Sequence, residues 1–129
     1  MAKLYVLFVA IGLLLPGCQQ HRIKISEAEG ICTAADEERM LLQYNYGAME
    51  YKPYVLKLFT PAGINVLRDQ VQDHPHHHGL MLAWKVDGVD FWTETPNCGF
   101  EIPGPITAKA QTGITVNNCL LSHSLEWRD

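Results

Sequence analysis

The sequence predicts an all-β fold, an antiparallel β-sandwich, and three observations support this prediction. Short segments rich in Leu, Tyr, Val and Phe follow residue 39 with a period close to two, as in half-buried strands. Turn residues such as Pro61-Ala62-Gly63 and Asp87-Gly88 separate these segments. No segment after the first twenty residues keeps a helical period. A chain of strands without helices buries its core by packing one sheet on another.

The N-terminus has the features of an export signal. Lys3 is basic, and Leu4–Leu15 is an apolar run that is too short to span a bilayer, which takes about 20 helical residues. Leu15-Pro16-Gly17-Cys18 resembles a bacterial lipobox, so residues 1–17 are predicted to be a lipoprotein signal peptide and Cys18 the lipidated residue. The alternative is an ordinary secretory signal cleaved nearby. In the first case a lipid anchors the exported protein to a bacterial membrane surface, facing the periplasm or the exterior.

The rest of the chain divides into two parts. Residues 18–39 are polar and are expected to be a tether and the segment that leads into the sheet, ending in a first turn or edge strand. Residues 40–129 are expected to form the β-sandwich. Within them, composition and alternation predict strands over Met40–Tyr46, Tyr54–Thr60, Ile64–Leu67, Leu80–Lys85, Val89–Glu94, Ile106–Gln111, Ile114–Leu121 and Ser122–Trp127.

Two turns connect the central strands. Pro61-Ala62-Gly63 makes Lys52–Leu67 a hairpin, and Asp87-Gly88 is a tight turn because both residues tolerate positive φ. The strand that returns from this tight turn places Asp90, Trp92 and Glu94 on one face. The final strand has no partner after it. Residues 40–129 are therefore expected to be the N-terminal part of a domain that is incomplete at its C-terminus, with the missing C-terminal half as a partner.

Composition and motifs exclude several functions. The formal net charge is −4 and there is no basic stripe, so nucleic acid is not an expected partner. The sequence has no G-x-S-x-G, Walker loop, H-E-x-x-H or dinucleotide fingerprint. Besides Cys18, the cysteines are Cys32, Cys98 and Cys119, and none has the C-x-x-C spacing of a cysteine zinc site. Export permits one disulfide among these three thiols, in any of three pairings.

The most informative feature for function is Asp73-His74-Pro75-His76-His77-His78-Gly79, which holds four of the six histidines. Histidine ligates metals and transfers protons near neutral pH, and it hydrogen-bonds hydroxyl groups. Pro75 favours an extended conformation for its neighbour. In an extended segment His74, His76 and His78 lie on one side and His77 on the other.

Three hypotheses remain open for this segment. The first is a carbohydrate site, in which His74 or His76 is the acid, Asp90 or Glu94 the base, and tryptophans form a stacking platform. The other residues expected to bind in it are Arg68, Asp69, Asp73, His77, His78, Trp84 and Trp92. The alternative for both tryptophans is packing in the core, and for Arg68 and Asp69 a solvated pair at a strand end.

The second hypothesis is a copper or zinc site ligated by His74, His76 and His78. A further ligand would come from Asp73, Asp90, Glu94 or His123. The third is a non-catalytic surface module, whose histidines only bond the backbone of a tight loop.

Several motifs occur in an order that is similar to a known family. They are Gln43-Tyr44-Asn45-Tyr46-Gly47, Lys52-Pro53-Tyr54, Leu58-Phe59-Thr60-Pro61-Ala62-Gly63, the histidine segment followed by Leu80, and Val89-Asp90-Phe91-Trp92. Over residues 40–129 they resemble the methane oxygenase PmoA-like family, a domain of unknown function in exported bacterial proteins. The resemblance implies a fold similar to the β-sandwich of aldose mutarotases and an association with sugar breakdown, and its name hints at copper. Members of that family are about twice as long and usually have arginine where His78 stands.

Overall fold

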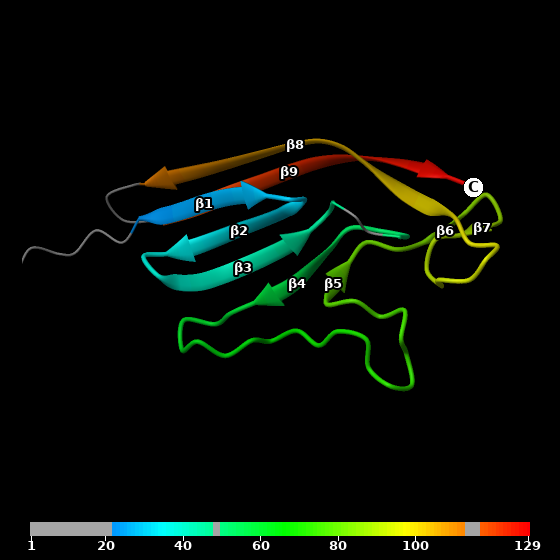
Figure 1. Ribbon diagram of the computed structural model, residues 1–129, viewed down its shortest axis with the longest axis horizontal. Helices are drawn as coiled ribbons and strands as arrows, with labels where there is room; N and C mark the ends of the chain where they lie inside the picture. Colours follow the sequence, from blue (N-terminus) through cyan, green and yellow to red (C-terminus); the bar gives the residue numbers. More distant parts are fainter. Residues whose placement is uncertain (1–21, 48–49, 113–116) are drawn as a thin grey trace, which may run out of the picture.

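The computed structural model describes residues 22–47, 50–112 and 117–129, and it confirms the all-β prediction (Figure 1). Every strand pairing in these ranges is antiparallel. In the same ranges, no helix is long and apolar enough to cross a membrane. The predicted signal peptide and the lipidation site Cys18 lie outside the described residues.

The first layer is a five-stranded meander in chain order. It consists of β1 (Ile23–Ala28), β2 (Ile31–Asp36), β3 (Arg39–Asn45), β4 (Tyr54–Leu58) and β5 (Leu80–Met81). Glu29 and Gly30, which connect β1 to β2, have φ of 50° and 75°. Positive φ at both central residues matches the right-handed twist of the strands that a hairpin joins.

The polar stretch of residues 18–39 differs from its prediction, because β1 and β2 occupy most of it. The expected edge strand is present as β1, but a tether is wrong for residues 23–36, because a second strand, β2, follows β1 there. In β1 the half-buried Ile23 and Ile25 alternate with the exposed Lys24 and Ser26. A strand with one face in water needs few apolar residues, so its composition resembles that of a linker.

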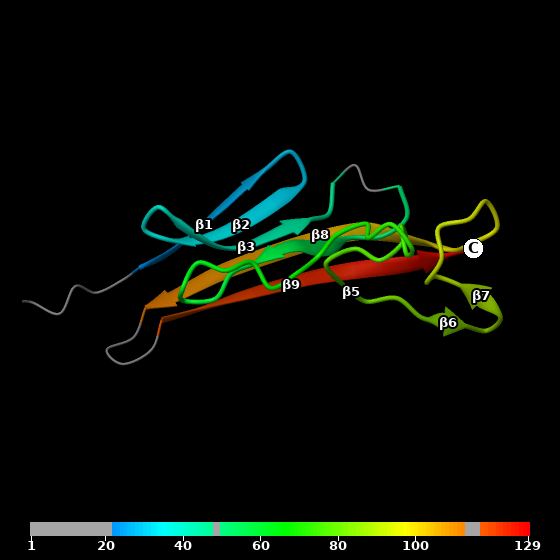
Figure 2. The ribbon, with the colours of Figure 1, turned by 90° about the horizontal axis from the view of Figure 1, so that it is seen from below.

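The second layer is the long hairpin of β8 (Phe100–Thr112) and β9 (Asn117–Arg128), which lies across the face of the meander (Figure 2). Tyr44 of β3 donates a hydrogen bond to Nδ1 of His123 in β9, over 2.7 Å, since Nε2 of the same ring faces the carbonyl of Gly104. Buried Cys32, Ala34 and Tyr44 form the core between the layers. The layered arrangement agrees with the predicted sandwich.

Two long strands replace the three that the sequence predicts between Ile106 and Trp127. Ser122 does not interrupt β9, and β8 begins six residues before Ile106. A bulge between Pro103 and Ile106 absorbs the Pro-Gly-Pro sequence, which the sequence pattern favours as a loop. Part of the predicted strand Ile114–Leu121 lies outside the described residues.

The chain between β4 and β5 is mostly irregular. The predicted turn after Thr60 is present, with a 2.9 Å bond from the Gly63 amide to the Thr60 carbonyl, but Ile64–Leu67 forms only an isolated bridge through Asn65. The predicted strand Leu80–Lys85 is reduced to β5 and to the start of β6 (Lys85–Val86). Few ladder bonds therefore hold this edge of the sheet.

The tight turn at Asp87-Gly88 is confirmed, with φ of 50° and 89°, and it joins β6 to β7 (Val89–Asp90). The predicted strand Val89–Glu94 is wrong beyond Asp90. The Asp90 carboxylate accepts the backbone N–H groups of Trp92 and Thr93, which turns the chain out of the strand.

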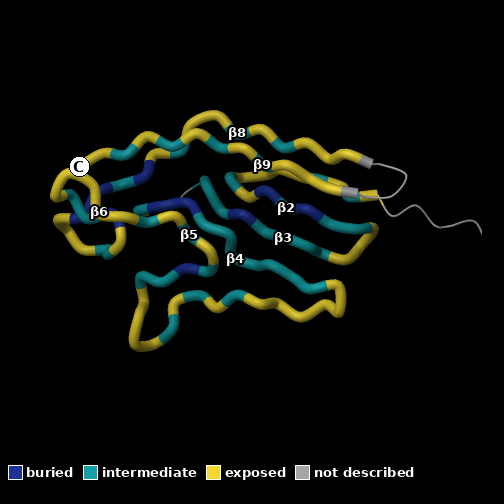
Figure 3. Tube along the Cα trace, turned by 180° about the vertical axis from the view of Figure 1, so that it is seen from behind, coloured by how far each residue is buried: buried dark blue, intermediate teal, exposed yellow. Residues whose placement is uncertain are grey.

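Buried residues gather in two places (Figure 3). One is the core along β2 and β3. The other lies towards the β6 end, where the chain segments that flank β4, β5 and β7 converge. This second cluster contains charged and polar side chains, because Lys52 and Glu101 are only 2% and 3% exposed and His78 is 7% exposed. Buried charges require partners, so this cluster is the place to look for a site.

Candidate functional site

A polar cavity of about 180 Å³ opens beside the second buried cluster. Its wall comes from four parts of the chain: the segment before and at the start of β4, the loop after Asp69, the end of the histidine segment and the loop after β7. The lining residues are Glu50, Tyr51, Lys52, Tyr54, Gln70, His78 and Glu94. Sequence analysis places only His78 and Glu94 in the site, and the other five become neighbours only through the fold.

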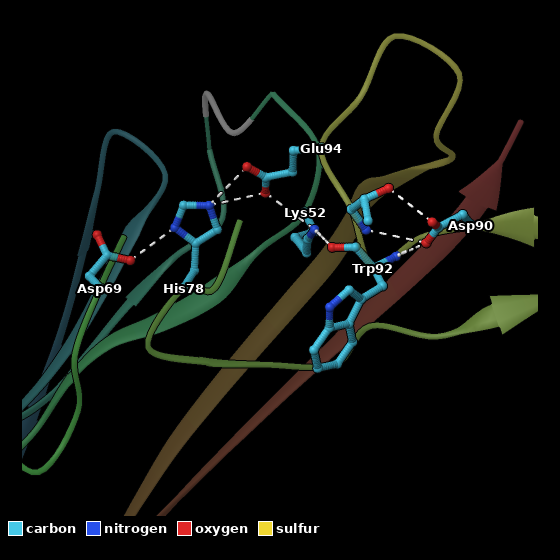
Figure 4. A network of polar contacts seen from close by, with 7 residues as sticks. Lys52, Asp69, His78, Asp90, Trp92 and Glu94 are labelled. Atoms are coloured by element: carbon cyan, nitrogen blue, oxygen red, sulfur yellow. Dashed lines mark hydrogen bonds and ion pairs between the residues drawn. The ribbon is translucent and has the colours of Figure 1, made fainter. Parts of the chain in front are cut away.

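His78 lies between two carboxylates in the wall of this cavity (Figure 4). Its Nδ1 lies 2.9 Å from Oδ1 of Asp69, and its Nε2 lies 3.0 and 3.1 Å from the two carboxylate oxygens of Glu94. The Tyr54 ring stacks on the imidazole, with centroids 4.4 Å apart. A carboxylate only accepts, so both ring nitrogens can donate at once only in the cationic form of the ring. His78 thus holds Asp69 and Glu94 in fixed positions.

Lys52 fixes Glu94 from the other side. Its Nζ lies 3.2 Å from Oε1 of Glu94 and donates a 2.9 Å hydrogen bond to the backbone carbonyl of Trp92. The ammonium group is almost fully buried, so it is stable there only because these acceptors replace water. Glu94 is consequently held by two donors, while its Oε2 keeps acceptor capacity for a further partner.

Close backbone contact brings the histidine segment to this position. A Cβ on Gly79 would collide with the carbonyl oxygen of Val55 in β4. Only glycine permits this approach, which seats the preceding His78 against the start of β4.

Glu101, at the start of β8, is a second buried carboxylate near Lys52. Neither of its oxygens has a hydrogen-bond partner among the described residues. Burial raises the pKa of Glu101 to about 7, although the charge of Lys52 opposes this rise. Burial, and then the nearby Glu101, raise the pKa of Tyr44 to about 12. The sequence gives no signal that singles out Glu101.

The other three histidines of the segment lie on a turn, so the predicted alternation of an extended strand is wrong. The amide of His74 bonds to the Val71 carbonyl over 2.8 Å, and the amide of His77 bonds to the His74 carbonyl over 3.0 Å. His74 and His77 stack with centroids 4.6 Å apart, and His76 meets His77 edge-on at the same distance. The turn therefore groups His74, His76 and His77 and directs His78 elsewhere.

The crowded imidazoles affect each other and their surroundings. Partial burial and the neighbouring His74 and His76 lower the pKa of His77. The His77 ring also meets the Trp92 indole edge-on, with centroids 5.2 Å apart. Asp73 lies 3.1 Å from Nδ1 of His74, and both side chains are exposed.

The metal set His74, His76 and His78 is not brought together. Both nitrogens of His78 already face carboxylates, so the ring has no free lone pair directed at a common point with the other two. In the described part of the chain, no group of three or more His, Cys, Asp or Glu side chains is arranged to hold a metal ion.

A second, more open cavity of about 480 Å³ adjoins the first. It is lined by Gln70, Pro75, His76, Thr93, Glu94 and Thr95. Gln70 and Glu94 belong to the walls of both cavities. We call the polar cavity beside His78 the inner cavity and this one the outer cavity.

The remaining candidates lie apart from the two cavities. Asp90 lines neither, and its oxygens accept three local hydrogen bonds, from the Trp92 amide and from the amide and hydroxyl of Thr93, which lower its pKa. Arg68 is exposed and lines neither cavity. Trp84 and Trp92 are 64% and 42% exposed, so packing in the core is wrong for both.

Sequence reasoning missed most of the inner cavity. Lys52 and Tyr54 belong to the Lys52-Pro53-Tyr54 motif, which was the one sequence feature that could have drawn attention to them as site residues. Gln70 has positive φ, 46°, and its amide bonds to the His77 carbonyl, so it closes the loop that carries the histidines. Nothing in the local pattern around Glu50, Tyr51 or Gln70 points to a site.

Comparison with known proteins supplies the family and no activity. The model of a family of unknown function, DUF6807, matches residues 32–129. No curated protein and no solved structure matches the chain. The family match spans β2 to β9 and both cavities, and thus most of the chain. The chain belongs to the DUF6807 family of unknown function.

Proposed function

We propose that this protein binds a carbohydrate, with one sugar ring in the inner cavity. The observation that carries the proposal is the composition of that cavity, which combines two tyrosine rings with carboxylate, amide and ammonium groups around about 180 Å³. Pockets for drug-sized ligands occupy roughly 300–1,000 Å³, so this space suits a smaller ligand. A sugar ring has the matching chemistry, with hydroxyls at its edge and C–H groups on its faces.

Different lining residues suit the hydroxyls and the C–H faces of the sugar ring. Oε2 of Glu94 has capacity to accept a hydroxyl hydrogen bond, and the Gln70 amide both donates and accepts. Tyr51 and Tyr54 present aromatic surface. Lys52 and His78 hold Glu94 in place, which removes the cost of orienting it when the ligand binds.

Acid–base catalysis on the bound sugar is the second function, and one observation favours it. Of the predicted catalytic residues, His74 and Asp90 line neither the inner nor the outer cavity, whereas His76 and Glu94 both line the outer cavity. These two side chains are the pair that would transfer a proton. The resemblance to the PmoA-like family, with its association with sugar breakdown, supports this direction.

The proposed location is the surface of a bacterial membrane, through lipid on Cys18 after export. The lipobox-like Leu15-Pro16-Gly17-Cys18 supports it. Cell fractionation with labelled palmitate tests it: the label and membrane retention should both be lost in Cys18→Ser. Unchanged membrane retention of that variant would contradict the proposal.

Calorimetric titration of the full chain with glucose, galactose, xylose and fructose tests binding. At least one sugar should bind, and Glu94→Gln should weaken it tenfold or more, about 1.4 kcal/mol, because a charged acceptor is lost. Glu38→Gln is the matched control, since Glu38 is exposed in the turn between β2 and β3 and lines neither cavity. Circular dichroism checks that both variants fold. Absence of binding to every sugar, or equal affinity for Glu94→Gln and the parent, would contradict the proposal.

A further inference from the structure

The two cavities share part of their walls. Gln70 and Glu94 line the inner cavity on one side and the outer cavity on the other. The remaining outer residues come from two segments, Pro75 and His76 from the histidine turn and Thr93 and Thr95 from the loop after β7. The shared residues place the two cavities next to each other, so a ligand longer than the inner cavity has the outer cavity beside it.

The chemistry of the outer cavity is also suited to a sugar ring. Pro75 offers a flat apolar surface, and His76 and the two threonines offer hydrogen-bonding groups. Among the described residues, neither lysine nor arginine lines this cavity. Its volume, about 480 Å³ against about 180 Å³, exceeds that of the inner cavity. A ring in this space is held more loosely and leaves room for the chain to continue.

The carboxylate of Glu94, which lines both cavities, is held in position by two neighbours. Glu94 bonds to His78 and pairs with Lys52, so its carboxylate keeps one orientation. The positive charge of Lys52 compensates the negative charge of Glu94. Glu94 therefore offers oriented acceptor oxygens without requiring a charged ligand. The bond between two neighbouring sugar rings would pass this point.

We propose that the ligand is a neutral oligosaccharide that occupies both cavities, with one ring in each and the linkage between the rings beside Gln70 and Glu94. This inference rests on the proposed carbohydrate function. It adds a second subsite, in the outer cavity, and it assigns His76 to the binding of the second ring.

The test compares each monosaccharide with its own disaccharide by calorimetry on the full chain. Glucose is paired with maltose and cellobiose, and xylose with xylobiose. One disaccharide should bind at least tenfold more tightly than its monosaccharide. His76→Ala should abolish most of this ratio, because it removes a wall of the outer cavity.

His74→Ala is the matched control. It removes the same type of side chain from the same turn. His74 meets His76 edge-on, with centroids 6.1 Å apart, but it is exposed and lines neither cavity, so the ratio should change far less than in His76→Ala. Equal affinities for monosaccharide and disaccharide would overturn the two-subsite proposal and leave the proposed function standing. A ratio that His76→Ala leaves intact would also overturn it. Binding of neither class of sugar would refute the proposed function itself.

Discussion

Glu101 provides a quantitative test of the buried cluster through the variant Glu101→Gln. Burial raises the pKa of Glu101 from 4.5 to about 7 in the folded protein. The folded state thus binds a proton that the unfolded state has released, and the free energy of unfolding falls as the pH rises from 4.5 to about 7. Since one pKa unit corresponds to about 1.4 kcal/mol, the loss amounts to about 3 kcal/mol. Below pH 4.5 and above about pH 7, Glu101 does not make the free energy of unfolding depend on pH.

Glutamine keeps the size of the side chain and carries no charge, so Glu101→Gln should lack this decline. Urea unfolding followed by circular dichroism at pH 5 and pH 8 gives the free energy of unfolding for parent and variant. Other titrating groups contribute equally to both proteins, so the difference between them isolates Glu101. Because pH 5 already lies inside the window, the variant should gain somewhat less than the full amount, about 2–3 kcal/mol, relative to the parent between the two pH values. Parallel pH profiles would refute the assigned burial of an unpartnered carboxylate.

Three further predictions concern the loops that form the site. His77 should titrate below 6.5 in an NMR titration, and His74→Ala should raise its pKa by removing a neighbouring imidazole; an unchanged midpoint would contradict this. Gly79→Ala should destabilise the fold by about 2 kcal/mol or more, because its Cβ would collide with Val55, whereas unaltered urea unfolding would count against this close approach. Asp90→Ala should cost about 1–2 kcal/mol of unfolding free energy and Asp90→Asn much less, since asparagine retains an acceptor; equal losses would disprove the local turn.

The predictable strands are those that carry several large apolar side chains, and the predictable turns are those with characteristic turn residues. Alternation indicated β3 and β4, and Asp87-Gly88 indicated its turn, because these features depend on local chemistry. β1 is largely exposed, and the buried side chains of β2, Cys32 and Ala34, are small, so both strands carried too little apolar character to be recognised. The Pro-Gly-Pro sequence in β8 looked like a loop because the pattern does not reveal that a bulge accommodates it.

The candidate site was predictable at the level of a loop and not of side chains. The histidine run pointed to a segment that contributes His78 to the inner cavity and His76 to the outer cavity. Whether it was extended or turned depended on contacts with residues outside it, such as the bond from the Gln70 amide to the His77 carbonyl. That turn separates His78 from the other imidazoles. Lys52 and Glu94 are distant in sequence, so their pairing appears only after the chain folds.

The central claim is that a sugar ring occupies the inner cavity, and a crystal structure of the full chain grown with glucose or maltose tests it most directly. We predict sugar density within hydrogen-bond distance of Glu94 and Gln70, with Tyr54 beside the ring. With maltose, the second ring should lie against His76. Density on exposed Trp84 instead, with none in the inner cavity, would contradict the account.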